Sequence, residues 1–461
     1  MPDPAVPPSR LLGVLFLGTL LAALDIALVG PALPAIGEAF GLDERGVSWV
    51  FTAFVLANLA GLPVMAALAD RVGRRRVYLA DVALFALGSV IVASAPSVAV
   101  LLAGRVVQGV GASGIFPVAS AVVGDTFPPE ARGRAVGLLG AVFGLAFLIG
   151  PVVGGVVLSV GSWRWLFVLT LPLAATVFAL SARVLPEAGG AGRRDAAPVD
   201  VAGIVLLAGS LVALAAGLSG VRADAVLGSL GDGRVWAPLA LALGLGAAFV
   251  AVERRAEAPL VRPGLVARRP VQIACALAVG AGLVEASFVF LSAYAVEAFG
   301  VTPSAGSYLL LPLVAGVGLG SPVAGRLLDR VGARPVVTAA SVLVAVGLAG
   351  IAAGPPLAGH VAATVAVGAG LAGLLGSSIS YILLVEAEVG ERTLAQGLST
   401  LFLSVGQLSG AAMIGAIAAS AAVPVAGYRA AFGALAVVAL ALAVVARALP
   451  RRAASGPAPR S

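Results

Sequence analysis

Long runs of apolar residues alternate with short polar segments along almost the whole chain. A helix that crosses a bilayer needs about 20 mostly apolar residues, and we count fourteen runs of roughly this length. The pattern therefore predicts an all-α integral membrane protein. The predicted spans are 11–33, 47–69, 77–95, 98–122, 135–158, 165–185, 199–218, 235–252, 271–296, 304–325, 335–354, 358–385, 397–422 and 428–449.

The two central runs leave an alternative open. The linker between them, 219–234, contains Arg222, Asp224, Asp232 and Arg234, so this region can also be interpreted as a re-entrant hairpin. In that case the chain has twelve spanning helices. The two clear apolar runs in this region favour fourteen spanning helices.

The distribution of arginine predicts the orientation. With both termini in the cytoplasm, 23 of the 29 basic residues lie inside, five lie outside and Arg105 lies within a span. Positive residues concentrate on the cytoplasmic side of membrane proteins. We therefore expect a multi-pass protein of the cell inner (plasma) membrane with both termini cytoplasmic. Removing two helices leaves the flanking loops on the same sides of the membrane, so the arginine distribution does not distinguish twelve spanning helices from fourteen.

Composition excludes several classes of protein. Hydrophobic residues make up 60% of the chain and charged residues 11%, against about 25% charged in a soluble domain. The net charge of +7 lies in short loops between apolar runs, which argues against nucleic-acid binding. One cysteine, Cys275, and one histidine, His360, which we place in a loop, leave no metal-ligand set. No nucleophile–base pair is apparent, so we expect no catalytic residues and no enzyme.

An internal duplication divides the chain. Segment 61–77 recurs at 320–336, with Gly, Pro, Val, Leu, Asp, Arg, Val, Gly, Arg and Val in register, and a weaker repeat links Arg132 with Arg392. Duplication within a hydrophobic chain is typical of transporters built from two halves. We predict an N-terminal six-helix bundle at 11–185, a linker with two extra helices at 186–270, a second six-helix bundle at 271–449 and a cytoplasmic tail at 450–461.

Three ionisable residues fall deep within predicted spans: Asp25, Arg105 and Glu285. A charge in hydrocarbon costs about 2.5–3.5 kcal/mol on insertion scales, so such residues are functional candidates. At about 1.5 Å of rise per residue, the three lie at one level, somewhat outside the midplane. Asp25 and Arg105 are interpreted as a proton-responsive pair or as a static ion pair between helices. Gln108 completes a network around Arg105 or simply joins two helices.

Glu285 is the acid at membrane depth in the second half. It is expected to bind a proton or attract a cationic substrate; the alternative is an acid facing a wet cavity without a transport role. Whether Asp25 or Glu285 is the principal proton site stays open. Asp81, one turn into its helix, is expected to pair with a loop arginine.

Several segments resemble one family in order and spacing. The repeated loop resembles the signature between helices 2 and 3 of the major facilitator superfamily. Further segments resemble its fourteen-helix drug:proton antiporter branch: Leu24-Asp25 with Ala32-Leu33-Pro34, the run from Arg105 to Gly111, Gly150-Pro151-Val152-Val153-Gly154-Gly155, Trp163-Arg164-Trp165 with Phe167, and Asp200-Val201-Ala202-Gly203. The resemblance covers essentially the whole chain and implies two pseudo-symmetric six-helix bundles plus two extra helices.

The resemblance also implies roles for the loops and for one helix. The repeated loops are expected to latch the halves on the cytoplasmic side, with Gly73 and Gly332 allowing tight turns; the alternative is that their arginines only set topology. The implied gate comprises Gly61, Asp70, Arg71, Gly73, Arg74, Arg132, Asp329 and Arg330. Close packing of the antiporter helix against the second half is implied for Gly144, Gly150, Pro151, Gly154 and Gly155.

These observations and the resemblance predict a proton-coupled exporter that works by alternating access. The resemblance implies small lipophilic or cationic compounds, including antibiotics, as its substrates. No Gly-rich loop ending in Lys-Ser/Thr is present, so we expect no cofactor and a proton gradient as the energy source. The expected partners are a small-molecule substrate, protons and the bilayer, with the protein as a monomer. The alternatives are a metabolite uniporter or importer of the same fold, and a non-transporting membrane scaffold or sensor.

Overall fold

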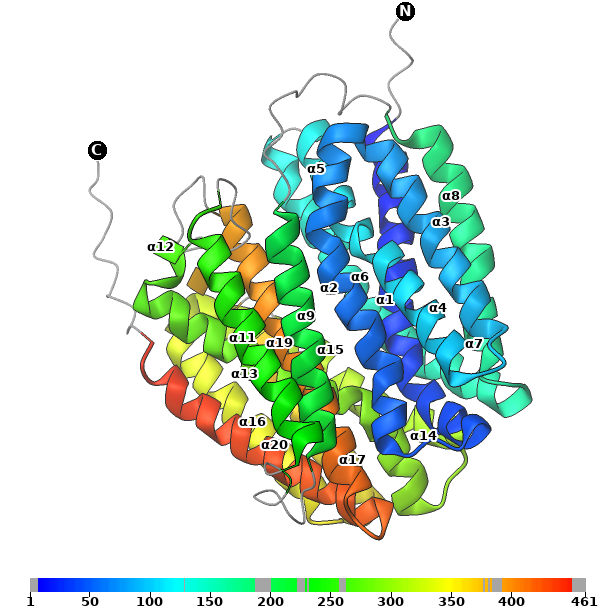
Figure 1. The fold of residues 1–461 in the computed structure, drawn as a ribbon, viewed down its shortest axis with the longest axis vertical. Coiled ribbons are helices and arrows are strands. Elements are labelled where there is room, and N and C mark those ends of the chain that lie inside the picture. The colour runs from blue at the N-terminus through cyan, green and yellow to red at the C-terminus, as the bar shows by residue number, and fades with distance from the viewer. Residues whose placement is uncertain are drawn as a thin grey trace, which may run out of the picture. The chain divides into compact units, whose positions relative to one another are not determined.

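The computed structural model describes residues 7–127, 129–186, 200–221, 229, 232–256, 263–375, 378–379, 382–383 and 392–449. Every regular element among them is a helix (Figure 1). The helices form two compact units, one containing 1–260 with 289–309 and the other containing 261–288 with 310–461. The predicted division at 185 and 270 into bundles and linker stays a prediction.

Thirteen helices of the described chain are long and apolar enough to cross a membrane, and the apolar segment Leu145–Val160 is shorter. Each coincides with one of the fourteen predicted runs, and the chain is a multi-pass helical membrane protein. The exact count of fourteen stays a prediction. The central pair forms two full-length helices, α9 (Val201–Gly220) and α11 (Gly233–Glu253), which pack against each other.

The first unit is built around α1, which packs against α6, and around α4, which packs between α2 and α3. Its α9 also packs against α2. The remaining members are α5, the short α7, α8, α11 and, from much later in the sequence, the short α14. The bounds are α1 Pro8–Phe40, α2 Glu44–Val72, α3 Arg74–Ala93, α4 Val98–Ser113, α5 Ile115–Thr126, α6 Pro129–Val160, α7 Arg164–Val168, α8 Thr170–Val184 and α14 Pro303–Tyr308.

The second unit consists of long helices in which α17 packs against both α15 and α16, and α20 packs against α16 and α19. The helix α13 begins in this unit and its last residues, from Val289, belong to the first. The bounds are α12 Pro263–Val266, α13 Arg269–Phe299, α15 Leu311–Val331, α16 Ala333–Ala352, α17 Leu357–Leu375, α19 Arg392–Ala419 and α20 Pro424–Ala446. His360, expected in a loop, lies buried in the first turn of α17, within the span predicted at 358–385.

The sequence repeat is also a structural repeat. Gly73 joins α2 to α3 as a single residue with φ of 107°, and Gly332 joins α15 to α16 with φ of 83°. Each glycine N–H donates to a carbonyl four residues earlier, at 3.2 and 3.0 Å. Since side chains disfavour positive φ, both turns require glycine, as the sequence predicted.

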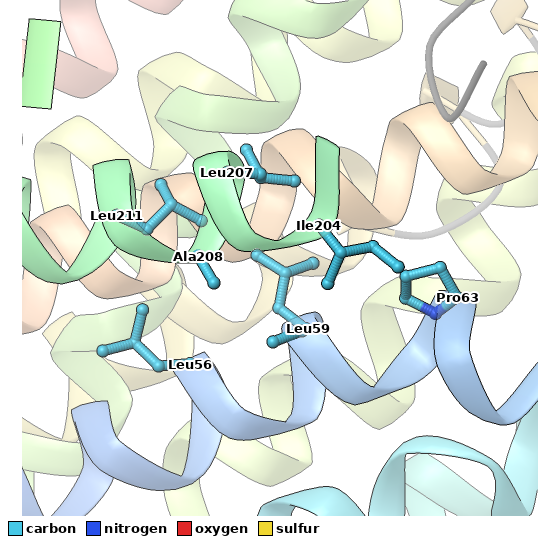
Figure 2. Close-up of a pocket in the computed structure, with 8 residues that line it drawn as sticks. Leu56, Leu59, Pro63, Ile204, Leu207, Ala208 and Leu211 are labelled. Carbon is cyan, nitrogen blue, oxygen red and sulfur yellow. The ribbon is translucent and has the colours of Figure 1, made fainter. Parts of the chain in front are cut away.

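The α2–α9 contact contains a small apolar cavity (Figure 2), with Leu56, Leu59 and Pro63 on α2 facing Ile204 and other residues of α9. Its volume is about 10 Å³, about enough for one water, and its walls offer no polar side chain. We interpret it as an imperfection in helix packing, because a drug-sized ligand needs roughly 300 Å³ or more.

Candidate functional site: a buried charge network in the first unit

Asp25 and Arg105 meet inside the first unit. Arg105 Nη1 lies 2.6 Å from Asp25 Oδ2, and both side chains are completely buried. The same nitrogen donates to Gln108 Oε1 at 2.8 Å, and Gln108 Nε2 donates to Asp25 Oδ1 at 3.0 Å. The three residues therefore close a ring of hydrogen bonds in which each carboxylate oxygen accepts one. The contacts between them agree with the sequence-based expectation, while their transport roles stay predictions.

The network extends to groups that sequence reasoning did not identify. Gln108 Nε2 donates to Ser89 Oγ on α3 at 2.9 Å, and Thr170 Oγ1 on α8 lies 3.2 Å from the same oxygen. Arg105 Nε donates to the carbonyl of Val50 on α2 at 3.0 Å. A buried serine or threonine carries no sequence signal of its own, and a backbone carbonyl carries none at all.

Aromatic rings and glycines position the guanidinium. The Arg105 Cζ atom lies 4.4 Å from the centre of the Phe54 ring, a cation–π distance. A Cβ on Gly88 would lie 2.5 Å from the backbone nitrogen of Gln108, and one on Gly109 would lie 2.4 Å from the carbonyl oxygen of Phe54. These glycines let α3 and α2 approach α4 closely enough for its polar side chains to reach their partners.

Glu285, in the second unit, has different hydrogen-bond partners from Asp25. Gln407 Nε2 on α19 donates to Glu285 Oε2 at 2.9 Å. No ion pair to Glu285 is present in the part of the chain that the structure describes, and its side chain is partly accessible. Asp25 thus accepts from a cation and an amide in a sealed site, whereas Glu285 accepts from one amide. Because the two acids belong to different units, their common depth stays a prediction.

The glycines of the antiporter segment lie at close contacts. A Cβ on Gly150 would meet Ala27 of α1 at 2.5 Å, and one on Gly155 would meet the Tyr308 ring of α14 at 2.5 Å. Ser307 Oγ of α14 donates to the Pro151 carbonyl at 2.7 Å, and Ser304 Oγ donates to the Gly155 carbonyl at 2.6 Å. Gly154 fits against Pro31 and Ser307. The two serines were missed by sequence reasoning; Gly144 lies outside the residues whose surroundings are described.

Two of the loop arginines, Arg74 and Arg75, brace helices within the first unit. Arg74 Nη1 donates to the Ala121 carbonyl on α5 at 2.6 Å, and Arg75 donates to the Ala182 carbonyl on α8. Gly61 packs against Ser113 of α4. Arg71 and Arg330 are exposed. The side chains of Asp70, Arg132 and Asp329 lie outside the described residues, so the latch between the repeated loops stays a prediction.

Asp81 does not pair with a loop arginine. It is fully buried on α3, and neither carboxylate oxygen has a hydrogen-bond partner among the described residues. Two nearby loop arginines, Arg74 and Arg75, donate to main-chain carbonyls of α5 and α8 instead.

A buried ion pair in a multi-pass helical membrane protein whose sequence contains an internal repeat is typical of transporters. A model of the Major Facilitator Superfamily matches residues 15–284 and 273–461. The chain belongs to the major facilitator superfamily. It is a transporter rather than an enzyme.

Curated relatives carry names from drug resistance. The chain is 31% identical over 399 residues to an uncharacterized MFS-type transporter, YfiU, of Bacillus subtilis, covering 85% of this chain and 76% of the relative. It is 34% identical to the puromycin resistance protein pur8 of Streptomyces alboniger, covering 73% and 66%. It is 30% identical to the multidrug resistance protein Stp of Mycobacterium tuberculosis, covering 88% and 74%.

Solved structures show the same fold at low sequence identity. A bacterial homologue of the human lysosomal transporter Spinster superposes with a TM-score of 0.67 at 16% identity, covering 95% of this chain and 96% of that one. The xylose transporter XylE of E. coli superposes with a TM-score of 0.64 at 16% identity, covering 96% and 98%.

Proposed function

We propose that this protein exports small lipophilic or cationic compounds in exchange for protons, by alternating access. The observation that carries the proposal is the pair of differently held carboxyls within apolar helices, Asp25 in its sealed ring and Glu285 beside a single amide. The names of the relatives, which include puromycin and multidrug resistance proteins, support the class of substrate. The predicted orientation puts export across the plasma membrane.

The two carboxyls are assigned different tasks. A carboxyl can exchange a proton with water where water reaches it and where no cation is already paired with it. Glu285 is partly accessible and has no arginine partner among the described residues, so we assign proton exchange with water to Glu285. Asp25 is paired with Arg105 and changes partners only if the ring with Gln108 opens.

A reconstituted system tests the proposal. Purified protein in liposomes with an imposed pH gradient is given a panel of fluorescent cationic dyes and antibiotics, including puromycin. We expect gradient-driven movement by the wild type, loss of coupling in Glu285→Gln, and at least a tenfold slower rate in Asp25→Asn. Glu38→Gln, which alters an exposed acid at the end of α1, is the matched control and keeps the wild-type rate.

The outcomes separate the alternatives. Substrate movement that ignores the pH gradient would identify a uniporter or importer. A double variant, Asp25→Asn with Glu285→Gln, that retains wild-type gradient-driven export would refute the role of the carboxyls. No movement of any compound, together with intact cellular function of the double variant, would favour a scaffold or sensor.

A further inference from the structure

A third carboxyl lies inside the first unit, apart from the Asp25 ring. Asp81 is fully buried on α3, and both of its oxygens have no hydrogen-bond partner among the described residues. Tyr78, one turn earlier on the same helix, is also fully buried, and its hydroxyl has no partner in the described chain. An acid and a phenol with unused hydrogen-bonding capacity therefore lie side by side on one helical face.

The carboxyl lies at a break between two helices. A Cβ built on Gly114 would be 1.9 Å from Asp81 Oδ2 and 2.9 Å from Met65 Cβ, so the acid packs directly on this glycine. Helix α4 ends at Ser113 and α5 begins at Ile115. Pro117 follows and has no N–H, so it cannot donate to the carbonyl of Ser113 as a helical residue would.

The described surroundings of Asp81 give neither carboxylate oxygen a hydrogen-bond donor. An ionised carboxylate only accepts hydrogen bonds, whereas a protonated carboxyl supplies one O–H donor. A buried carboxylate without a partner costs several kcal/mol, and in practice such a group is neutralised. A proton on Asp81 removes the charge and provides a hydrogen-bond donor next to the helix break. At that break, Pro117 leaves the Ser113 carbonyl without its usual helical donor.

No positive group compensates Asp81 in the described structure. The described arginines on α3 and on the elements packed against it bond elsewhere or are exposed. Arg74, Arg75, Arg45 and Arg164 donate to main-chain carbonyls, Arg105 pairs with Asp25, and Arg71, Arg76 and Arg183 are exposed. Tyr78 is the nearest titratable side chain along α3 and makes no hydrogen bond to the acid.

We propose that Asp81 is a proton-binding site of the first unit, in which a neutral carboxyl is held against the α4–α5 break. The site lies about 10 Å from the start of α3, at about 1.5 Å per residue over seven residues. Ser89 of the Asp25 ring lies two turns further along the same helix. The inference extends the proton side of the proposed function, but the occupancy of the site by a proton does not depend on transport.

Infrared spectroscopy of the full-length protein in lipid tests the proposal directly. The carboxyl C=O band of a protonated aspartic acid is measured at neutral pH in protein labelled with ¹³C at the aspartate carboxyl carbons. We expect a band that shifts with the label, persists in Asp25→Asn and is completely lost in Asp81→Asn. Asparagine keeps the shape and a donor, so this variant is expected to unfold within a few degrees of the wild type.

The result does not depend on the success of the transport assay. Absence of an isotope-shifted protonated band in the Asp25→Asn protein would overturn the proposal even if Asp81→Asn failed to fold, because that measurement leaves Asp81 in place. Persistence of the band in folded Asp81→Asn would overturn it as well. A labelled band in a protein that exports nothing would support the site and refute only the proposed function.

Discussion

Replacing Arg105 by methionine tests how strongly the charge network holds the first unit together. Methionine is apolar, helix-compatible and of similar length, so it retains part of the contact with Phe54. The substitution removes the 2.6 Å ion pair to Asp25, the 2.8 Å bond to Gln108 and the 3.0 Å bond to the Val50 carbonyl. Asp25 is left as a buried charge with a single amide donor.

The expected cost follows from what remains unpaired. Breaking a buried ion pair by removing one partner costs about 3–5 kcal/mol, and we expect a destabilisation in this range for Arg105→Met. Asp25→Asn leaves the guanidinium uncompensated and is expected to cost a similar amount. The double variant contains neither charge, so its cost is expected to be about 2–3 kcal/mol smaller than the sum of the two single changes.

Equilibrium unfolding in mixed detergent micelles measures all three variants. Arg76→Met is the matched control, because Arg76 is exposed at the start of α3, and its expected effect is within about 0.5 kcal/mol. If the two single effects simply add, with a coupling below about 0.5 kcal/mol, the ring does not stabilise the unit and the reasoning from its geometry fails.

Three further changes probe the packing and the turns. Gly155→Val drives a side chain into the Tyr308 ring and should cost at least about 2 kcal/mol in the same unfolding assay. The control is Gly13→Ala, because a Cβ at Gly13 meets nothing within 4 Å. This change should be neutral or stabilise the protein by up to about 1 kcal/mol. Ser307→Ala removes the bond to the Pro151 carbonyl and should cost about 0.6–1 kcal/mol; an unchanged unfolding midpoint would contradict that bond. Gly332→Ala, at φ of 83°, should cost about 1–2 kcal/mol, and no loss would show that the turn relaxes.

The spans were predictable because crossing a bilayer imposes one strong constraint on a single stretch of sequence. An apolar run of the required length leaves little choice of structure, and the Gly73 and Gly332 turns are marked by both glycine and repetition. Breaks inside spans were not predicted. The run 98–122 is interrupted after Ser113, where Gly114 and Pro117 combine; either residue alone is common within membrane helices.

The candidate site was only partly predictable. Asp25 and Arg105 were found because charge in an apolar run is costly wherever it occurs. Ser89, Thr170 and Ser307 were not found, because small hydroxyl side chains also bond to their own helix and give no signal of a tertiary partner. Asp81 was assigned a partner wrongly, since nearness in sequence to several arginines does not show where those long side chains point.

The hydrogen bonds of the ring and its glycine contacts depend on each other. Arg105 on α4 bonds to α1 and α2, and Gln108 bonds to α1 and α3, so a small separation of any of these helices leaves a buried polar group without its partner. The close approaches at Gly88 and Gly109 bring α3 and α2 up to the same turns of α4. Since tightly packed elements shift between discrete arrangements rather than deform continuously, the core of the first unit has to move as one body. In the proposed transport, we therefore expect motion that exposes a substrate to come from displacement of the first unit as a whole or from the α4–α5 break, against which we propose that a protonated Asp81 is held.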